Sequence, residues 1–160
     1  DDMVSRGLGD VYKRQGPASE MRRMPSSSVQ LVVTSPPFLD VVQYADDNWL
    51  RCWFCGIDAK AVPITMARSV EAWRAAMAEV FDELYRVVRP GGYVAFEVGE
   101  VRRGKVRLEE HVVPVAAESG FEPELVMLHT QDFTKTAKCW GVENNKLGTN
   151  TNRVVVLRRP

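Results

Sequence analysis

The sequence is poor in residues that ligate metals or form covalent crosslinks. Its 160 residues include three cysteines and two histidines. A zinc site needs about four ligands, and no histidine lies near Cys52 and Cys55 in the chain. We therefore expect no metal. We interpret this C-x-x-C pair as two small apolar residues on a helix, with redox or metal chemistry as the less favoured alternative.

The sequence also lacks a long apolar run and an excess of either charge. No stretch reaches the length of a membrane span, and the beginning of the chain has no apolar signal-peptide core. Basic and acidic residues number 21 each, although residues 125–160 carry six basic and two acidic side chains. We expect a cytoplasmic protein without a membrane partner, whose C-terminal part would face any polyanion.

Residues 1–15 lack hydrophobic periodicity and begin with Asp rather than Met. The stretch VSRGLGDVYKRQ resembles a translated sequencing-adapter tail. We therefore expect residues 1–15 to be a non-native tail, the true N-terminus to be missing, and the domain to occupy residues 16–160.

Hydrophobic periodicity in the remaining chain predicts alternating strands and helices. The expected strands are 29–34, 93–98, 125–129 and 154–157, and the expected helices are about 46–57, 70–88 and 109–118. This order favours an α/β fold with a mostly parallel sheet, whose last two strands form an antiparallel hairpin at the edge. Asp46 or Asp47 is the expected N-cap of the first helix, and Ser69 of the second. Trp49, Trp53 and Trp73 are expected in the core.

The segment Leu31–Phe38, LVVTSPPF, ends an apolar run with two prolines and an aromatic residue. Proline cannot donate to a sheet ladder, so the strand must end there. In such sheets, ligands bind at the carboxyl ends of the strands. The Ser35 hydroxyl and the backbone carbonyls near Pro36 would be rigid acceptors beside the flat ring of Phe38. This combination suits a planar base that carries an exocyclic amine.

Ser35-Pro36-Pro37-Phe38 resembles the S/D-P-P-Y/F/W motif of the DNA amino-methyltransferases. Two further segments are similar to this family: VVRPGGYVAFEVGE after the second helix, and NRVVVLRR at the last strand. The resemblance covers roughly residues 16–160. It implies the C-terminal part of a Rossmann-like methyltransferase sheet, mostly parallel with an antiparallel last strand.

The resemblance also implies a reaction and roles for the motif. A methyl group would pass from S-adenosylmethionine to the exocyclic amine of a flipped base in double-stranded DNA, as in restriction-modification systems. Cytosine N4 is favoured over adenine N6. Ser35 and the Pro36 carbonyl would accept hydrogen bonds from the amine, Pro37 would hold the turn, and Phe38 would stack on the base. Thr34 and Ser35 would border the cofactor.

One element of that family is missing from the sequence. We find no F-x-G-x-G loop to hold the cofactor, because Gly7 and Gly9 follow no strand, whereas Gly91 and Gly92 precede one. We therefore expect a partial catalytic domain that lacks half of the cofactor pocket and binds S-adenosylmethionine weakly or not at all.

Several polar residues near these elements are further candidates. The long polar loop 132–152 could contact phosphates and base edges through Lys135, Lys138, Trp140, Asn144 and Asn145, or it could be a solvated surface loop.

Asp40 and Tyr44 could line the base pocket or precede the next helix. Glu97 or Glu100 could face the site from the second strand.

Two other functions remain open. An RNA base methyltransferase shares the Pro-Pro-aromatic pattern. A non-catalytic α/β nucleic-acid-binding module, or an inactive fragment, would use the two prolines only as a turn.

Overall fold

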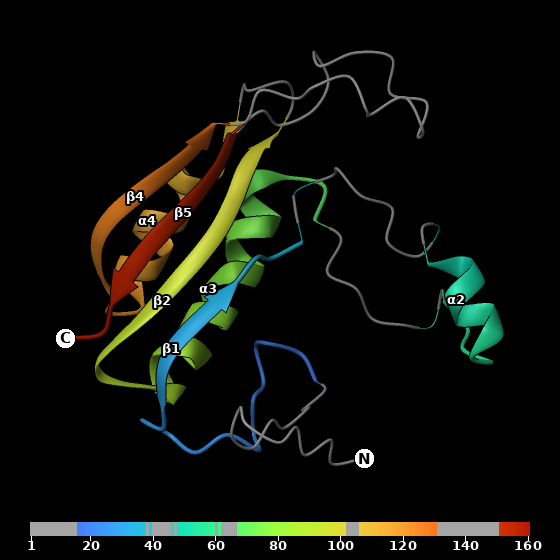
Figure 1. Ribbon diagram of the computed structural model, residues 1–160, viewed down its shortest axis with the longest axis horizontal. Coiled ribbons are helices and arrows are strands. Elements are labelled where there is room, and N and C mark those ends of the chain that lie inside the picture. Colours follow the sequence, from blue (N-terminus) through green and yellow to red (C-terminus); the bar gives the residue numbers. More distant parts are fainter. Residues whose placement is uncertain are drawn as a thin grey trace, which may run out of the picture.

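The computed structural model describes residues 16–37, 39, 46, 48–59, 61, 67–101, 106–130 and 151–160. Within these ranges the chain forms a twisted sheet backed by helices, as Figure 1 shows. The strands are β1 (Val29–Thr34), β2 (Val88–Val101), β3 (Val106–Arg107), β4 (Glu122–Thr130) and β5 (Thr151–Arg158). The helices are α2 (Trp49–Phe54), α3 (Val70–Val87) and α4 (Glu109–Glu118).

The main sheet has the strand order β1-β2-β5-β4, and the short β3 pairs with β2. β1 and β2 are parallel, whereas β5 is antiparallel to both of its neighbours, β2 and β4. β1, β2 and β4 therefore run in one direction, and β5 runs against them. This confirms the predicted α/β class with an antiparallel last strand. It also shows that the last strand lies inside the sheet and that β4 is the edge.

Helix α3 begins where the sequence predicts. The Ser69 hydroxyl accepts a hydrogen bond from the backbone N–H of Ala72 at 3.1 Å, which satisfies one of the unpaired amides of the first turn. The buried face repeats every three or four residues, as an amphipathic helix requires. Its members are Trp73, Met77, Phe81, Leu84 and Val87.

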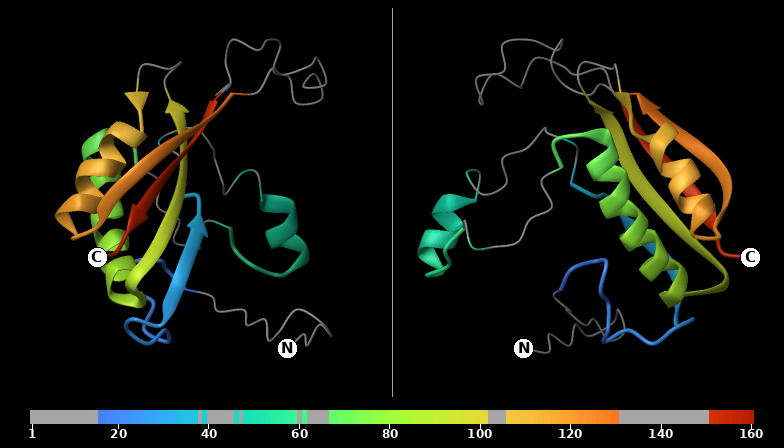
Figure 2. Two further views of the ribbon diagram at one scale, coloured as in Figure 1. Left: turned by 60° about the vertical axis from the view of Figure 1, so that its left-hand side comes forward. Right: turned by 180° about the vertical axis from the view of Figure 1, so that it is seen from behind.

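Helix α4 forms over the predicted residues with Pro114 inside it. It ends before Gly120, which has a positive φ of 102° and so provides the usual left-handed stop. α3 and α4 lie on the same face of the sheet (Figure 2).

The core lies between this helical layer and the sheet. β2 points Val94, Phe96 and Val98 towards the helices, and β5 adds Val155 and Leu157; all are buried. The Phe81 ring of α3 packs on Phe96 with ring centroids 4.8 Å apart. This alternation follows from the two-residue period of a strand. The residues that alternate with these in β2 and β5 therefore lie on the opposite face of the sheet.

Helix α2 differs from the prediction in its packing. Trp49 is 61% exposed and Trp53 is 68% exposed, so the expectation that both lie in the core is wrong. The helix has six residues and no buried side chain, and it lies away from the sheet in Figure 1. Its N-cap is Asn48 rather than an aspartate. The apolar face predicted by spacing exists, but no element in the described ranges packs against it.

Candidate functional site

The Pro-Pro motif lies where β1 leaves the sheet. β1 ends at Thr34, which is paired with Phe96 of the parallel strand β2, and Ser35-Pro36-Pro37 follows outside the ladder. The structure thus confirms that the strand ends at the prolines. The segment lies at the carboxyl end of β1, beside the C-terminal half of β2; in open α/β sheets, ligands bind at the carboxyl ends of the strands.

A cleft of about 450 Å³ opens beside this segment. Thr34, Ser35, Pro36 and Pro37 all line it, together with side chains of α3 that include the buried Met77 and the exposed Glu79. A further wall comes from the segment before β1, through Pro17, Ala18, Ser19 and Met21. The cleft is therefore mainly apolar, and its polar lining residues are Ser19, Thr34, Ser35 and Glu79.

Helix α3 contacts the motif directly. The indole Nε1 of Trp73 donates a hydrogen bond to the backbone carbonyl of Pro37, with a nitrogen-to-oxygen distance of 3.0 Å. Trp73 is 1% exposed, and a buried indole N–H requires an acceptor. The prediction that Trp73 belongs to the core is confirmed. The sequence did not reveal that this core residue also binds the motif.

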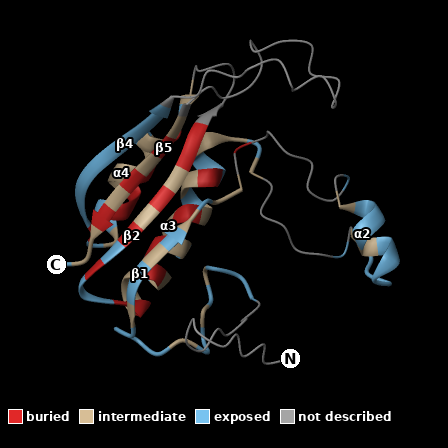
Figure 3. Ribbon diagram, in the orientation of Figure 1, coloured by how far each residue is buried: buried red, intermediate tan, exposed pale blue. Residues whose placement is uncertain are grey.

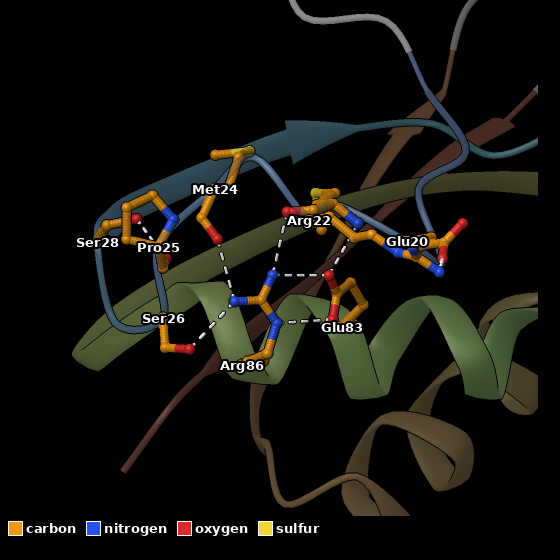
Figure 4. Close-up of polar contacts among 9 residues, drawn as sticks. Glu20, Arg22, Met24, Pro25, Ser26, Ser28, Glu83 and Arg86 are labelled. Carbon is orange, nitrogen blue, oxygen red and sulfur yellow. Dashed lines mark hydrogen bonds and ion pairs between the residues drawn. The ribbon is translucent and has the colours of Figure 1, made fainter.

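A second polar contact holds the segment before β1 against α3 (Figure 4). The Arg86 guanidinium donates to the carbonyls of Met21 and Met24 at 3.1 and 3.0 Å, and to both carboxylate oxygens of Glu83. The backbone N–H of Met21 also donates to Glu83 at 2.8 Å. Hydrogen bonds from Arg86, and then from the Met21 amide, lower the pKa of Glu83 against the opposing effect of burial. This pair fixes one wall of the cleft.

At the end of the sheet where β1 leaves the ladder, β5 and α4 share an ion pair. Arg153 Nε lies 2.7 Å from Glu109 Oε1, and both side chains are largely buried. Arg153 is paired with Val98 across the β2–β5 ladder, so the ion pair lies near the carboxyl end of β2. The sequence pattern does not predict this ion pair, because the two residues lie 44 positions apart in the chain and share no local pattern.

The structure brings together four of the predicted site residues: Thr34, Ser35, Pro36 and Pro37. Glu97 is partly buried on β2, on the face away from α3. The other candidates lie outside the residues or side chains that the structure describes. They are Phe38, Asp40, Tyr44, Glu100, Lys135, Lys138, Trp140, Asn144 and Asn145.

The described part of the chain contains neither a cluster of metal ligands nor a membrane-spanning helix. Within it, no group of three or more His, Cys, Asp or Glu side chains could hold a metal ion. Cys52 and Cys55 are free thiols. Among the same residues, no helix combines the length and apolar character that crossing a bilayer requires.

Comparison with solved structures identifies similar folds. A candidate DNA modification methylase from Thermus thermophilus, solved with S-adenosyl-L-methionine, aligns with a TM-score of 0.56 at 22% identity, over 91% of this chain and 54% of that one. The cytosine-N4-specific PvuII DNA methyltransferase aligns with a TM-score of 0.57 at 14% identity, over 91% of this chain and 48% of the enzyme. The chain has a methyltransferase fold.

The similarity lies in the fold and covers part of each solved structure. No family model matches the sequence, and no curated protein matches it. The chain spans about half the length of the solved structures above. At this level of identity the comparison establishes the fold that the sequence pattern predicted.

Proposed function

We propose that this chain is the motif-bearing part of an S-adenosylmethionine-dependent methyltransferase acting on the exocyclic amine of a flipped DNA base. The observation that carries the proposal is the position of Ser35-Pro36-Pro37. These residues border a cleft at the carboxyl end of β1, next to its parallel neighbour β2, in a methyltransferase fold. A rigid set of oxygen acceptors at that place suits an amino group that must be oriented for attack.

The residues of this chain would act mainly by positioning. The Ser35 hydroxyl and the Pro36 carbonyl would accept hydrogen bonds from the two N–H groups of the amine, which directs the nitrogen lone pair towards the reacting carbon. Each residue before a proline is restricted to an extended backbone, so these acceptors need little reordering when the base arrives. Positioning and fixed dipoles provide most of the rate enhancement in such direct transfers. When bound, the cofactor supplies an electrophilic methyl group.

The residues present fit one side of a cofactor pocket. Thr34 and Ser35 offer hydroxyls at the mouth of the 450 Å³ cleft, and Glu79 offers a carboxylate. The sequence has no F-x-G-x-G loop. We therefore propose that residues 16–160 form a partial catalytic domain and that chain outside residues 1–160 completes the pocket. The half-length coverage of the solved structures supports this proposal.

Within this proposal, cytosine N4 is the favoured target. The serine at the first position of the motif favours it, and one similar structure is named as cytosine-N4-specific. Phe38 is proposed to stack on the base, and Lys135, Lys138, Trp140, Asn144 and Asn145 to contact duplex DNA. These roles rest on the sequence.

The deciding experiment measures tritiated methyl transfer to unmethylated duplex DNA by the protein encoded by the complete reading frame. Ser35→Ala and Phe38→Ala should each abolish most of the activity. Ser28→Ala is the matched control, because Ser28 is an exposed serine just before the other end of β1. Mass spectrometry of the digested DNA should detect N4-methylcytosine. Activity that survives both motif substitutions would refute the site.

Two further measurements separate the alternatives. Transfer to RNA instead of DNA would identify an RNA methyltransferase, and DNA binding without any transfer would identify a binding module. Calorimetry on residues 1–160 alone should show weak or no binding of S-adenosylmethionine. A micromolar dissociation constant there would contradict the proposed half pocket.

A further inference from the structure

We propose that Trp73 is a positioning residue for methyl transfer: its indole N–H fixes the Pro37 carbonyl and thereby orients the acceptors of Ser35 and Pro36. The inference rests on the proposed function. Trp73 touches neither acceptor directly in the contacts described above. Its role would be exerted through the backbone of the motif.

The first step is the rigidity of the donor. Trp73 is the fourth residue of α3, and its backbone N–H donates to the Ser69 carbonyl at 3.0 Å. Ser69 also caps the helix through its side chain. The indole is almost completely buried. A side chain packed in this way has little rotational freedom, so the N–H is held in one direction.

The second step is the stiffness of the acceptor segment. Pro36 and Pro37 each have φ fixed by the ring, and Ser35 and Pro36 each precede a proline, which restricts them further. Movement of the Pro37 carbonyl would therefore be transmitted to its two predecessors rather than absorbed by local rotation. A hydrogen bond at the end of this segment therefore restricts the orientation of the residues before it.

The third step concerns which oxygens remain available. The Pro37 carbonyl is occupied by Trp73, so it is directed at α3 and not at a substrate. This leaves the Ser35 hydroxyl and the Pro36 carbonyl as the acceptor pair for an amine with two protons. Because a misplacement of about 1 Å can reduce a rate by about 100-fold, loss of the Trp73 contact should reduce turnover without removing a substrate contact.

The test replaces the indole N–H while keeping the ring. Benzothienylalanine introduced at position 73 exchanges N–H for sulfur and keeps the fused ring. For this variant we expect kcat for DNA methylation to fall about 10- to 100-fold, with KM for DNA and the melting temperature nearly unchanged. Trp73→Phe is genetically simpler, but it also leaves a cavity in the core and should lower the melting temperature as well. The same replacement at the exposed Trp53 should change none of these. The inference would be overturned if the variant at position 73 kept the kcat of the unsubstituted protein. It would also be overturned if kcat fell only in proportion to the loss of folded protein.

A second readout needs no catalysis. In residues 1–160, amide and indole hydrogen exchange followed by NMR should show the Trp73 indole proton exchanging much more slowly than those of Trp49 and Trp53. Rapid exchange at Trp73 would overturn the inference. If the indole is protected but the unsubstituted protein transfers no methyl group, the proposed function fails and the positioning role fails with it. If the substituted protein transfers methyl groups at the rate of the unsubstituted protein, only the role of Trp73 fails.

Discussion

At the scale of single residues, two adjacent glycines near the start of β2 are each required for a different physical reason. Gly91 has a φ of 75°, which side chains rarely adopt. Gly92 has an ordinary φ, but a Cβ there would lie 2.9 Å from the carbonyl oxygens of Arg89 and Gln30. Both glycines also exchange backbone hydrogen bonds with Arg159, at 2.8 and 2.9 Å. The R-P-G-G turn therefore joins β1, β2 and the end of β5.

Gly92→Ala should destabilise the protein. The added methyl group would meet two backbone oxygens and the Val88 side chain, and such overpacking costs about 1–3 kcal/mol. Urea unfolding followed by circular dichroism would measure the loss. Gly16→Ala is the matched control, because nothing lies within 4 Å of its Cβ position. Equal stabilities of the two variants would show that the close approach is relieved at little cost.

At the scale of elements, α3 contacts the sheet, the cleft wall and the motif. The cap at its first turn should therefore contribute to the free energy of unfolding. Ser69→Ala removes the side-chain cap from Ala72 and should lower the free energy of unfolding by about 1 kcal/mol. Ser69→Asp keeps an acceptor and should restore most of the loss. Thermal denaturation of the three proteins tests this. If the aspartate variant is as unstable as the alanine variant, the cap is not the cause.

The Glu83–Arg86 contact should make stability depend on pH in the acid range. The folded state lowers the pKa of Glu83 from its ordinary value of 4.5. The contact therefore stabilises the fold above pH 4.5, and this contribution is lost as the pH falls through the lowered pKa. Glu83→Gln should be less stable than the parent protein at neutral pH and equal to it in strong acid.

Urea unfolding across this pH range measures the two curves. Glu118→Gln, an exposed glutamate at the end of α4, controls for the loss of one charge. A constant difference between parent and Glu83→Gln at every pH would contradict the assignment of the lowered pKa to this contact.

At the scale of the whole molecule, the helices that the structure describes beside the sheet cover only one of its faces. Val33, Ala95, Val156 and Leu125 form one row across the other face, as the strand registers show. Val33 is 75% exposed, and Leu125 is also exposed. Figure 3 shows exposed segments on both outer strands, β1 and β4. An apolar row of this kind is typical of a surface that is covered in a larger assembly.

Residues 1–160 alone should therefore bind the hydrophobic dye ANS in the folded state. Val33→Lys should reduce the dye fluorescence and leave the melting temperature nearly unchanged, because Val33 is exposed. Val32→Lys is the matched control on the same strand: Val32 packs against the core and lines the cleft. That substitution should lower the melting temperature clearly. If Val33→Lys were as destabilising as Val32→Lys, the face would not be open.

Much of the fold was predictable because its signals are local. The stripe from Trp73 to Val87, the Ser69 cap and the apolar run of β1 are each local features of the chain, and hydrophobic periodicity identifies the helix and the strand. The exposure of Trp49 and Trp53 was not predictable. Spacing reveals that a helix has an apolar face, but not whether another element lies against it.

For the candidate site, the sequence by itself determined the Ser35-Pro36-Pro37 segment, its position after a strand and its rigidity, because proline acts on its own backbone and its neighbour. Only the tertiary structure decided that β5 enters between β2 and β4, that Glu83 and Arg86 hold the cleft wall, and that Trp73 binds Pro37. The Trp73–Pro37 contact joins residues 36 positions apart. Such contacts depend on how separate elements pack, and no local pattern encodes that packing.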